Sequence, residues 1–278
     1  MCRPIAGLAL LVLLFPIPSA AQGIVDVVVE GNELRAGISL PGGLGADLTI
    51  SFEQVVGLSA ANLGLSAEVL ELLDPDLLAR LTQAQIPAGF PVLLRIEPPA
   101  GGGLSFSGVA SISLHTHNLA FLPNTPLRIF AAHDGGRFQD ITESMGMGSY
   151  RARGRKGDFS EFLILADLRP VNAVIAEKLD RIDGILDENE ERIAQPALAQ
   201  LTALLSQIRN AHAAGNTRRA IAKTEEFLSV VKSNSGAAIP DVWRSARDLV
   251  NVAGLLRAAG ETLRFSLSLK SNLSLGLL

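Results

Sequence analysis

The sequence predicts an α+β protein in which an N-terminal antiparallel β-sandwich, residues 22–170, is followed by a C-terminal four-helix antiparallel bundle, residues 171–262. Two observations predict this order, and a third excludes other classes of protein. Apolar residues alternate with polar ones over residues 24–168, which is typical of half-buried strands. After Pro170 the apolar residues recur at helical spacing. Finally, 48% of the residues are hydrophobic and the net charge is only −4, which excludes a mostly disordered chain and a strongly basic nucleic-acid binder.

Residues 1–21 have the pattern of a secretory signal peptide. Arg3 supplies the positive charge, residues 5–15 form an apolar stretch, and residues 19–21 are small, as signal peptidase prefers. The apolar stretch is shorter than the roughly 20 residues that a membrane-spanning helix needs. The alternative is an N-terminal anchor that is never cleaved. Cleavage would remove Cys2, the single cysteine, so the exported chain would contain no disulfide.

Short strands separated by turns are predicted throughout the first half. Clusters of Gly, Pro, Asn and Asp lie between the alternating segments and are typical of turns. Many short strands of this kind favour a sandwich of Greek-key type with about eight to ten strands. One helix is predicted among them, over residues 74–83, because Asp74 can cap it and Pro75 suits its first position. The predicted strands are 24–29, 33–40, 48–52, 92–96, 109–114, 127–130 and 162–165.

Four helices are predicted after Pro170. Prolines and glycines lie where helices commonly begin and end, and the short connections imply antiparallel neighbours. The helices are expected over 175–193, from Pro196 to Gly215, over 217–233 before Gly236, and from Pro240 onward. The last of them has the clearest apolar seam, with spacings that alternate between four and three: Val242, Ala246, Leu249, Ala253, Leu256 and Gly260.

The C-terminal tail, residues 263–278, returns to an alternating pattern. Polar residues separate Leu263, Phe265, Leu267 and Leu269. The prediction is a strand that pairs with the sandwich and ties the two halves together. The competing interpretation is a continuation of the last helix, because periodicity alone does not separate helix from strand in so short a segment.

Two segments resemble known modules. Residues 127–167, through the segments "LRIF", "GRFQDI" and "FSEF", resemble the last strands of the ZU5-like sandwiches of bacterial exported proteins. Residues 198–256 resemble the helical module called FIMAH, which has small or apolar residues at the positions of Gly215, Ala220, Phe227, Val230, Gly236 and Ile239. The whole arrangement resembles an exported proteobacterial family of unknown function. The resemblance implies architecture and location, and it assigns no catalytic residue.

His115 and His117 form a candidate metal-binding motif. Residues two apart on a strand project from the same face, so both imidazoles can reach one ion, for which zinc is the expected choice. A third ligand is needed. The candidates are His133, Asp134 and Asp140, and the predicted site is His115, His117 and His133. The competing and favoured interpretation is that the imidazoles lie on a solvated or interfacial face and bind no metal, so that the protein has no cofactor.

Arg151, Arg153 and Arg155 form a second candidate site. Their alternation places three guanidinium groups on one face of a strand, where they can bind an anionic glycan, a lipid headgroup or protein carboxylates. The competing and favoured interpretation is a solvated edge strand, whose charges discourage pairing with other sheets.

The predicted function is a non-enzymatic binding protein of the bacterial envelope, in the periplasm or outside the cell, with an envelope protein or glycan as its partner. The sequence contains none of the GxSxG, HExxH or phosphate-loop motifs, and this disfavours an enzyme. The alternative function is a metal-dependent hydrolase centred on His115, His117 and His133. A third possibility is a purely structural role in the envelope. Neither a nucleic-acid partner nor a transmembrane segment in the mature chain is expected.

Overall fold

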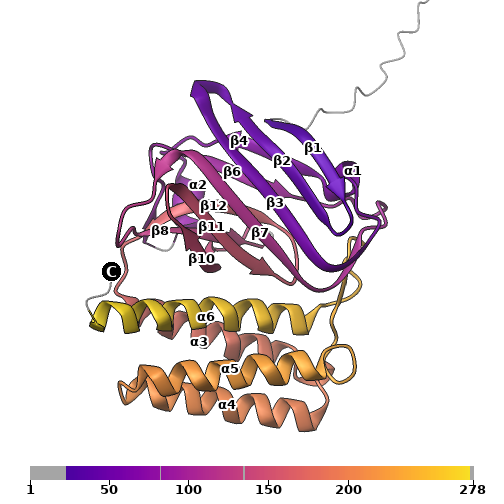
Figure 1. Ribbon diagram of the computed structural model, residues 1–278. Helices are drawn as coiled ribbons and strands as arrows, with labels where there is room; N and C mark the ends of the chain where they lie inside the picture. Colours follow the sequence, from indigo (N-terminus) through magenta and orange to yellow (C-terminus); the bar gives the residue numbers. More distant parts are fainter. Residues whose placement is uncertain (1–22, 82, 134, 276–278) are drawn as a thin grey trace, which may run out of the picture.

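The computed structural model describes residues 23–81, 83–133 and 135–275, and Figure 1 shows two sheets in the first half of the chain and four long helices in the second. The α+β class and the order of sheets before helices are therefore confirmed. The predicted signal peptide, residues 1–21, and Asp134 lie outside the described residues. Within the described ranges, no helix combines the length and the apolar character that crossing a bilayer requires.

Every pair of named strands is antiparallel. The seven-stranded sheet has the order β1-β2-β3-β7-β11-β10 with β13 paired to β7, and the six-stranded sheet has the order β4-β6-β12-β8-β9 with β5 paired to β12. The strands are β1 Ile24–Glu30, β2 Glu33–Leu40, β3 Leu44–Val56, β4 Leu65–Val69, β5 Ala84–Gln85, β6 Val92–Ile96, β7 Ser105–Ala120, β8 Leu127–Ala132, β9 Gln139–Asp140, β10 Thr142–Gly146, β11 Ser149–Lys156, β12 Glu161–Asp167 and β13 Val242–Arg244.

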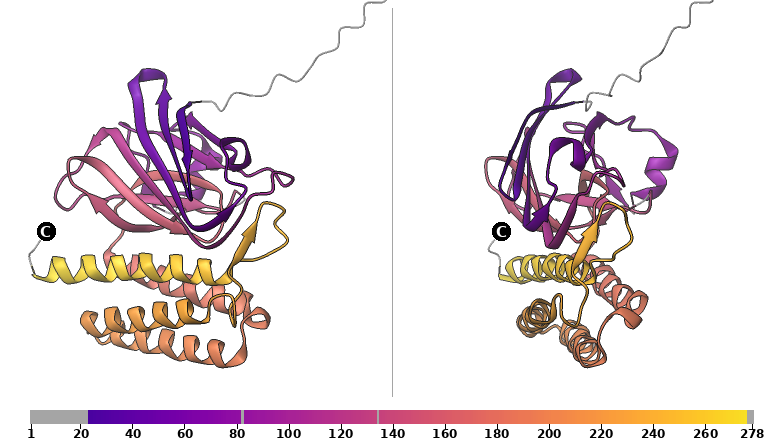
Figure 2. Two further views of the ribbon diagram at one scale, coloured as in Figure 1. Left: turned by 45° about the vertical axis from the view of Figure 1, so that its right-hand side comes forward. Right: turned by 90° about the vertical axis from the view of Figure 1, so that its right-hand side faces the viewer.

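All of the strands predicted from alternation in the first half of the chain are present, but the total exceeds the expected eight to ten. The excess comes partly from β5 and β9, which have two residues each and are too short to show a period. The two sheets share one core, to which Leu34 and Ile112 contribute from the seven-stranded sheet and Leu94 and Ile164 from the six-stranded sheet. The two layers are visible edge-on in the right-hand view of Figure 2.

Two short helices lie within the β half, α1 at Ala60–Leu63 and α2 at Pro75–Arg80. The carboxylate of Asp74 accepts hydrogen bonds from the backbone N–H groups of Asp76 and Leu77, and Pro75 is at the start of α2, as the sequence predicts. The helix is shorter than the predicted 74–83. Gln83 has a positive φ of 66°, which a right-handed helix does not allow.

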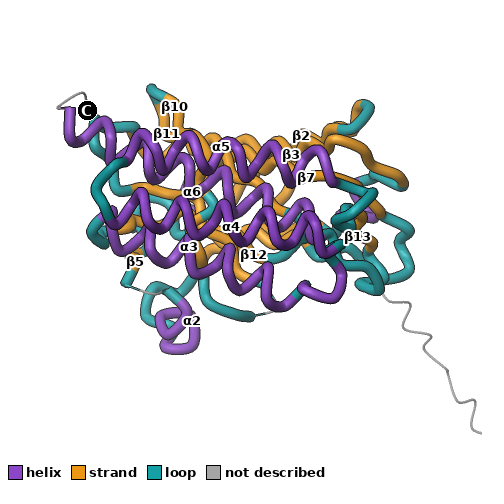
Figure 3. The backbone as a smooth tube through the Cα atoms, turned by 90° about the horizontal axis from the view of Figure 1, so that it is seen from below, coloured by secondary structure: helices purple, strands orange, loops and turns teal. Residues whose placement is uncertain are grey.

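Four long helices follow: α3 Val171–Glu188, α4 Gln195–Ala213, α5 Thr217–Asn234 and α6 Val252–Leu275. Contacts join α3 to α4, α4 to α5, α5 to α6 and α6 to α3. Figures 1 and 2 show α3 and α6 next to the sheets and α4 and α5 on the far side, and Figure 3 shows the helices lying over the strands when seen from below. Gly215 and Gly236 follow their helices as predicted, and both are left-handed, with φ values of 71° and 76°.

The predicted helix after Pro240 is wrong in its first part, because residues 242–244 form β13 and α6 begins only at Val252. β13 pairs with β7, with Trp243 opposite Phe106. The Trp243 ring lies 5.4 Å from the ring of Phe106 and 5.3 Å from that of Phe159. The extended backbone therefore completes hydrogen bonds on β7 and buries the tryptophan in the core between the sheets, which a helix at this position would not do.

The predicted strand in the tail, 263–278, is also wrong, because α6 continues through Leu275; residues 276–278 lie outside the described residues. Leu263 and Leu267 are fully buried in the helical core. Phe265, in contrast, lies beneath the guanidinium of Arg128 on β8, at 5.7 Å. Because α6 contacts helices on one side and strands on the other, it carries apolar residues on two faces, and these mimic the alternation of a strand.

Buried polar contacts join the two halves. Lys178 on α3 donates from Nζ to Asp140 Oδ2 at 2.6 Å, to Thr262 Oγ1 at 2.7 Å and to Ser266 Oγ at 2.8 Å. The amide of Asn251, just before α6, donates to the carbonyl oxygen of Gly108 on β7 at 2.7 Å. These contacts fix the position of α3 and α6 against the sheets, since each buried polar group needs its partner.

Candidate metal centre

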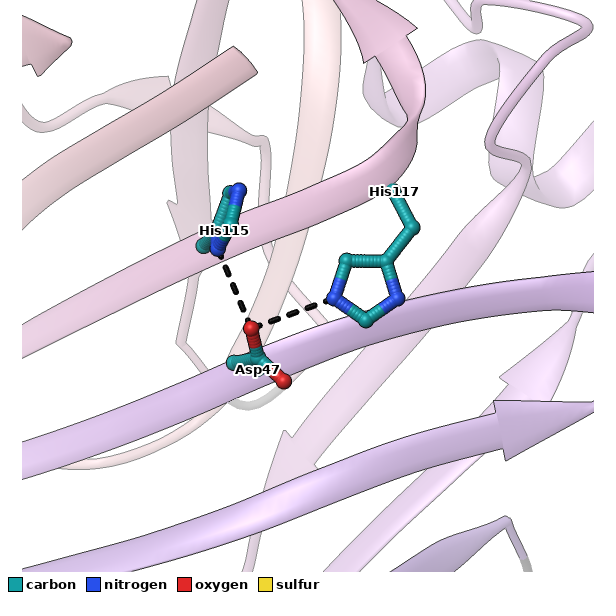
Figure 4. A group of neighbouring side chains, drawn as sticks. All are labelled: Asp47, His115 and His117. Carbon is teal, nitrogen blue, oxygen red and sulfur yellow. Dashed lines mark hydrogen bonds and ion pairs between the residues drawn. The ribbon is translucent and has the colours of Figure 1, made fainter. Parts of the chain in front are cut away.

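Asp47 on β3 and His115 and His117 on β7 converge on the outward face of the seven-stranded sheet (Figure 4). Asp47 lies directly opposite His115 in the β3–β7 register, and the two histidines share a face because they are two residues apart on a strand. Asp47 Oδ2 is 3.0 Å from His115 Nδ1 and 3.1 Å from His117 Nε2. The three possible ligand atoms all lie within 4.8 Å of one another.

Neighbouring groups hold this cluster in place. His115 Nε2 is 2.6 Å from Ser149 Oγ on β11, which leaves Nδ1 facing Asp47. A Cβ at Gly45 would come within 3.0 Å of His117 Nδ1, so the glycine provides the space for that ring. A hydrogen bond from His117 lowers the pKa of the Asp47 carboxyl; partial burial opposes this effect, and charge on His117 and His115 reinforces it.

The spacing of these atoms suits a tetrahedral metal ion. Zinc binds nitrogen and oxygen ligands at about 2.0–2.1 Å, so neighbouring ligand atoms of a tetrahedral site lie about 3.3 Å apart. The two O···N distances, 3.0 and 3.1 Å, are close to this value. The contact of His115 with Ser149 is the kind of second hydrogen bond that orients a metal-bound imidazole. Two imidazoles and a carboxylate can therefore hold zinc or a similar first-row ion.

The structure brings together His115 and His117 but not His133, so the predicted third ligand is wrong. His133 follows β8 in the other sheet, and its Nδ1 lies 3.2 Å from Asp158 Oδ2. Asp140, another candidate, is buried against Lys178. Sequence reasoning missed Asp47, which is 68 residues from His115. Its outward-facing position in an alternating segment was a visible signal, but only the pairing of β3 with β7 shows which histidine it meets.

The three arginines of β11 have different surroundings. Arg151 and Arg153 are exposed, and Arg151 lies opposite His115 in the β7–β11 register. Arg155 is engaged in ion pairs with Glu143 at 2.9 Å and Glu261 at 3.3 Å, so it joins β11 to α6. The edge-strand interpretation is wrong, because β11 pairs with β7 on one side and β10 on the other.

The fold and this cluster define an α+β protein with a candidate three-ligand metal centre on an exposed sheet face. Residues 9–270 match a family of unknown function (DUF6689), and the chain belongs to that family. This confirms the expectation of a family whose function is unknown. No curated protein matches the chain.

Proposed function

We propose that this chain is an exported binding protein of the bacterial envelope that uses a divalent metal ion on its seven-stranded sheet to hold an acidic ligand. In this proposal residues 1–21 are removed as a signal peptide, and the mature protein is periplasmic or extracellular. The sheets act as a β-sandwich scaffold, and α3 to α6 form an antiparallel four-helix bundle that supports it. The observation that carries the proposal is the convergence of Asp47, His115 and His117.

The surroundings of the cluster favour an acidic ligand. Three protein ligands leave one position of a tetrahedral ion open to a further donor. Arg151, exposed and opposite His115, stands beside that position on the next strand. A carboxylate of the ligand can therefore bind the metal with one oxygen and the guanidinium with the other. Envelope glycans and proteins both carry such groups, in agreement with the partner class predicted from the sequence.

The exposure of the cluster favours binding over hydrolysis. The side chains of Asp47, His115 and His117 are 61%, 25% and 51% exposed. A hydrolytic metal centre gains from a site that restricts water and from a positioned general base. The residue on β11 that lies opposite His115 is the cation Arg151, which cannot act as a general base. The hydrolase alternative, in its predicted form, also required His133, which lies on the other sheet beside Asp158.

Metal analysis tests the proposal directly. Protein purified without a histidine tag is expected to bind one zinc ion per chain by mass spectrometry and titration calorimetry. Asp47→Asn and His115→Gln should each abolish this binding, because two ligands do not retain the ion. His212→Gln is the matched control, since His212 lies on α4, away from the cluster. Unchanged metal content in His115→Gln would refute the site.

A second measurement separates binding from hydrolysis. Zinc-loaded protein should retain polygalacturonate, a carboxylated polysaccharide, but not neutral dextran, and a chelator should release it. Arg151→Gln should weaken retention, whereas Lys223→Gln, which removes a cation from α5, should not. Zinc-dependent cleavage of ester or phosphoester substrates, lost in His115→Gln, would instead favour the hydrolase.

A further inference from the structure

A separate cavity of about 430 Å³ lies where the six-stranded sheet meets α3 and the segment before α6. Its volume is within the range of small-molecule sites, about 300–1,000 Å³. Among the described residues, four basic side chains and two carboxylates, Asp158 and Glu188, line it. The cations come from four different segments of the chain: Arg137, Lys156, Arg181 and Arg247. The cavity is therefore positively charged.

One of the two carboxylates is already committed to basic partners. Asp158 lies 2.7 Å from Lys156 Nζ and 3.2 Å from His133 Nδ1. Burial acts to raise the pKa of Asp158, but the charge and hydrogen bond of Lys156 outweigh it, so the pKa lies below its usual range. Asp158 therefore neutralises Lys156, which is 4% exposed, and Glu188 is the one other carboxylate that lies beside Arg137 and Arg181 among the described lining residues.

Arg181 has charge without an acceptor. Its guanidinium donates no hydrogen bond to the residues that the structure describes, although the negative charges of Asp158, Asp140 and Glu177 act on it. Burial lowers the pKa of Arg181, and the negative charge of Asp158 opposes this effect. Arg181 is only partly buried and lines the cavity, so an anion bound there can accept hydrogen bonds from its guanidinium.

The walls of the cavity are held close together by backbone contacts. A Cβ at Gly157 would lie 2.5 Å from the backbone nitrogen of Leu255, so the turn between β11 and β12 packs directly on α6. Arg247 has a positive φ of 57°, a conformation that side chains larger than glycine rarely adopt and that is often found at binding sites. A cavity formed in advance loses less entropy when it binds a ligand.

We infer that this cavity binds a small molecule with a phosphate or carboxylate group, which accepts hydrogen bonds from Arg181 while the remainder packs against Trp243. The Trp243 ring lines the cavity and is 7% exposed. Guanidinium groups recognise both oxyanions through paired hydrogen bonds, so phosphate and carboxylate share this chemistry. The cavity takes Lys156 and Trp243 from the seven-stranded sheet, but it shares no residue with the metal centre and does not depend on it.

Trp243 provides the test, because it is the only tryptophan of the chain. Titration with inorganic phosphate and with citrate at constant ionic strength should change its fluorescence to a plateau. The midpoint of thermal unfolding should rise with the same probes, as expected for a ligand of the folded state. Arg181→Gln should weaken binding about tenfold or more, because it removes charge-assisted hydrogen bonds. Lys223→Gln, which removes a cation from α5, should bind like the unmodified protein.

If Arg181→Gln does not fold, Arg137→Gln replaces it, since Arg137 is an exposed residue of the cavity wall and should also weaken binding. Tighter binding of phosphate or of citrate identifies which oxyanion the cavity prefers. The inference is overturned if neither probe gives a plateau in fluorescence or a rise in unfolding temperature. Equal weakening by Arg181→Gln and Lys223→Gln would also overturn it, because the effect would then reflect net charge alone.

Discussion

Asp140 and Asp47 are both carboxylates in contact with basic side chains, but their surroundings are opposite. Asp140 is 3% exposed and lies 2.6 Å from Lys178 Nζ, between the sheets and α3. The side chain of Asp47 is 61% exposed and lies 3.0 and 3.1 Å from two histidine nitrogens, on a sheet face open to solvent. The two clusters show how burial decides what a charged group can do.

The polar groups of the buried cluster are engaged with one another. Lys178 donates to Asp140, Thr262 and Ser266, and the second carboxylate oxygen of Asp140 accepts from the backbone N–H of Thr142. Burial acts to raise the pKa of Asp140, but Lys178 outweighs it and holds the pKa below its usual range. Asp47, His115 and His117 lose little hydration when the chain folds, and their side chains remain accessible to a ligand from solvent. The first therefore fixes the two halves, and the second is available for binding.

The largest effect is expected from Lys178→Met. This variant leaves the Asp140 carboxylate buried without its partner, which typically costs about 3–5 kcal/mol in the free energy of unfolding. Urea denaturation measures the change, and Lys223→Met, on the surface of α5, is the control. A loss below about 1 kcal/mol would place this pair in the same class as surface ion pairs and remove the contrast.

The double variant Asp140→Asn with Lys178→Met tests whether the unpaired charge causes this loss. It leaves no buried charge, and the carbonyl oxygen of the introduced side-chain amide can still accept from the N–H of Thr142. Most of the stability lost in the single variant should return, because replacing both members of a buried ion pair is often nearly neutral. If the double variant were as unstable as Lys178→Met, the cost would come from packing and not from the unpaired charge.

The next largest effect is expected at Gly157, where the β half packs on α6. In Gly157→Ala the new Cβ would lie 2.5 Å from the backbone nitrogen of Leu255, and backbone cannot move aside easily. A loss of about 1–3 kcal/mol in unfolding free energy is expected. Gly184→Ala on α3 is the matched control: its Cβ meets nothing within 4 Å, and the change should stabilise by about 0.5–1 kcal/mol. Equal effects would contradict the close contact.

A smaller and gradual loss in the free energy of unfolding is expected as the pH falls. Because the pKa of Asp140 is lower in the folded state than the unfolded value of about 3.9, its contribution to stability is present above about pH 4. That contribution is lost as the pH falls through the folded-state pKa. Urea denaturation along a pH series measures this loss. The free energy of unfolding should fall less at low pH in the Asp140→Asn, Lys178→Met double variant than in the unmodified protein. Parallel curves would show that other carboxylates cause the acid sensitivity.

The smallest effects on stability are expected in the exposed cluster. His115→Gln should change the unfolding free energy by less than about 1 kcal/mol, because exposed pairs contribute little. Its zinc affinity should nevertheless fall by more than about 100-fold, and that of Ser149→Ala by about tenfold, as for the loss of a hydrogen bond that orients a ligand. Urea denaturation measures the stability and calorimetry the zinc affinity. A large loss of stability without loss of zinc would reverse the assignment of the two clusters.

Local patterns were sufficient wherever neighbouring residues decide the structure. Alternation along residues 33–40 predicted a strand, because one side of β2 is buried and the other is not. Asp74 and Pro75 predicted the start of α2, since cap geometry involves residues only two or three apart. Gly215 and Gly236 predicted helix ends for the same reason.

Local patterns failed where a segment meets two different neighbours. Val242, Ala246 and Leu249 have helical spacing, yet Trp243 is drawn into the aromatic core and residues 242–244 are extended. Leu263 to Leu269 alternate like a strand, yet α6 is a helix packed on two sides. In both cases the partner surface, and not the period of the sequence, selected the conformation.

The sequence by itself determined the α+β class, the order of the two halves and the pairing of His115 with His117 on one face. All three follow from repeats of two or of 3.6 residues, which are properties of a single segment. Only the tertiary structure decided that Asp47 completes the cluster, that His133 belongs to another site, and that Arg181 faces a cavity. These are contacts between segments far apart in the chain, and they depend on strand register and helix packing, which no local period encodes.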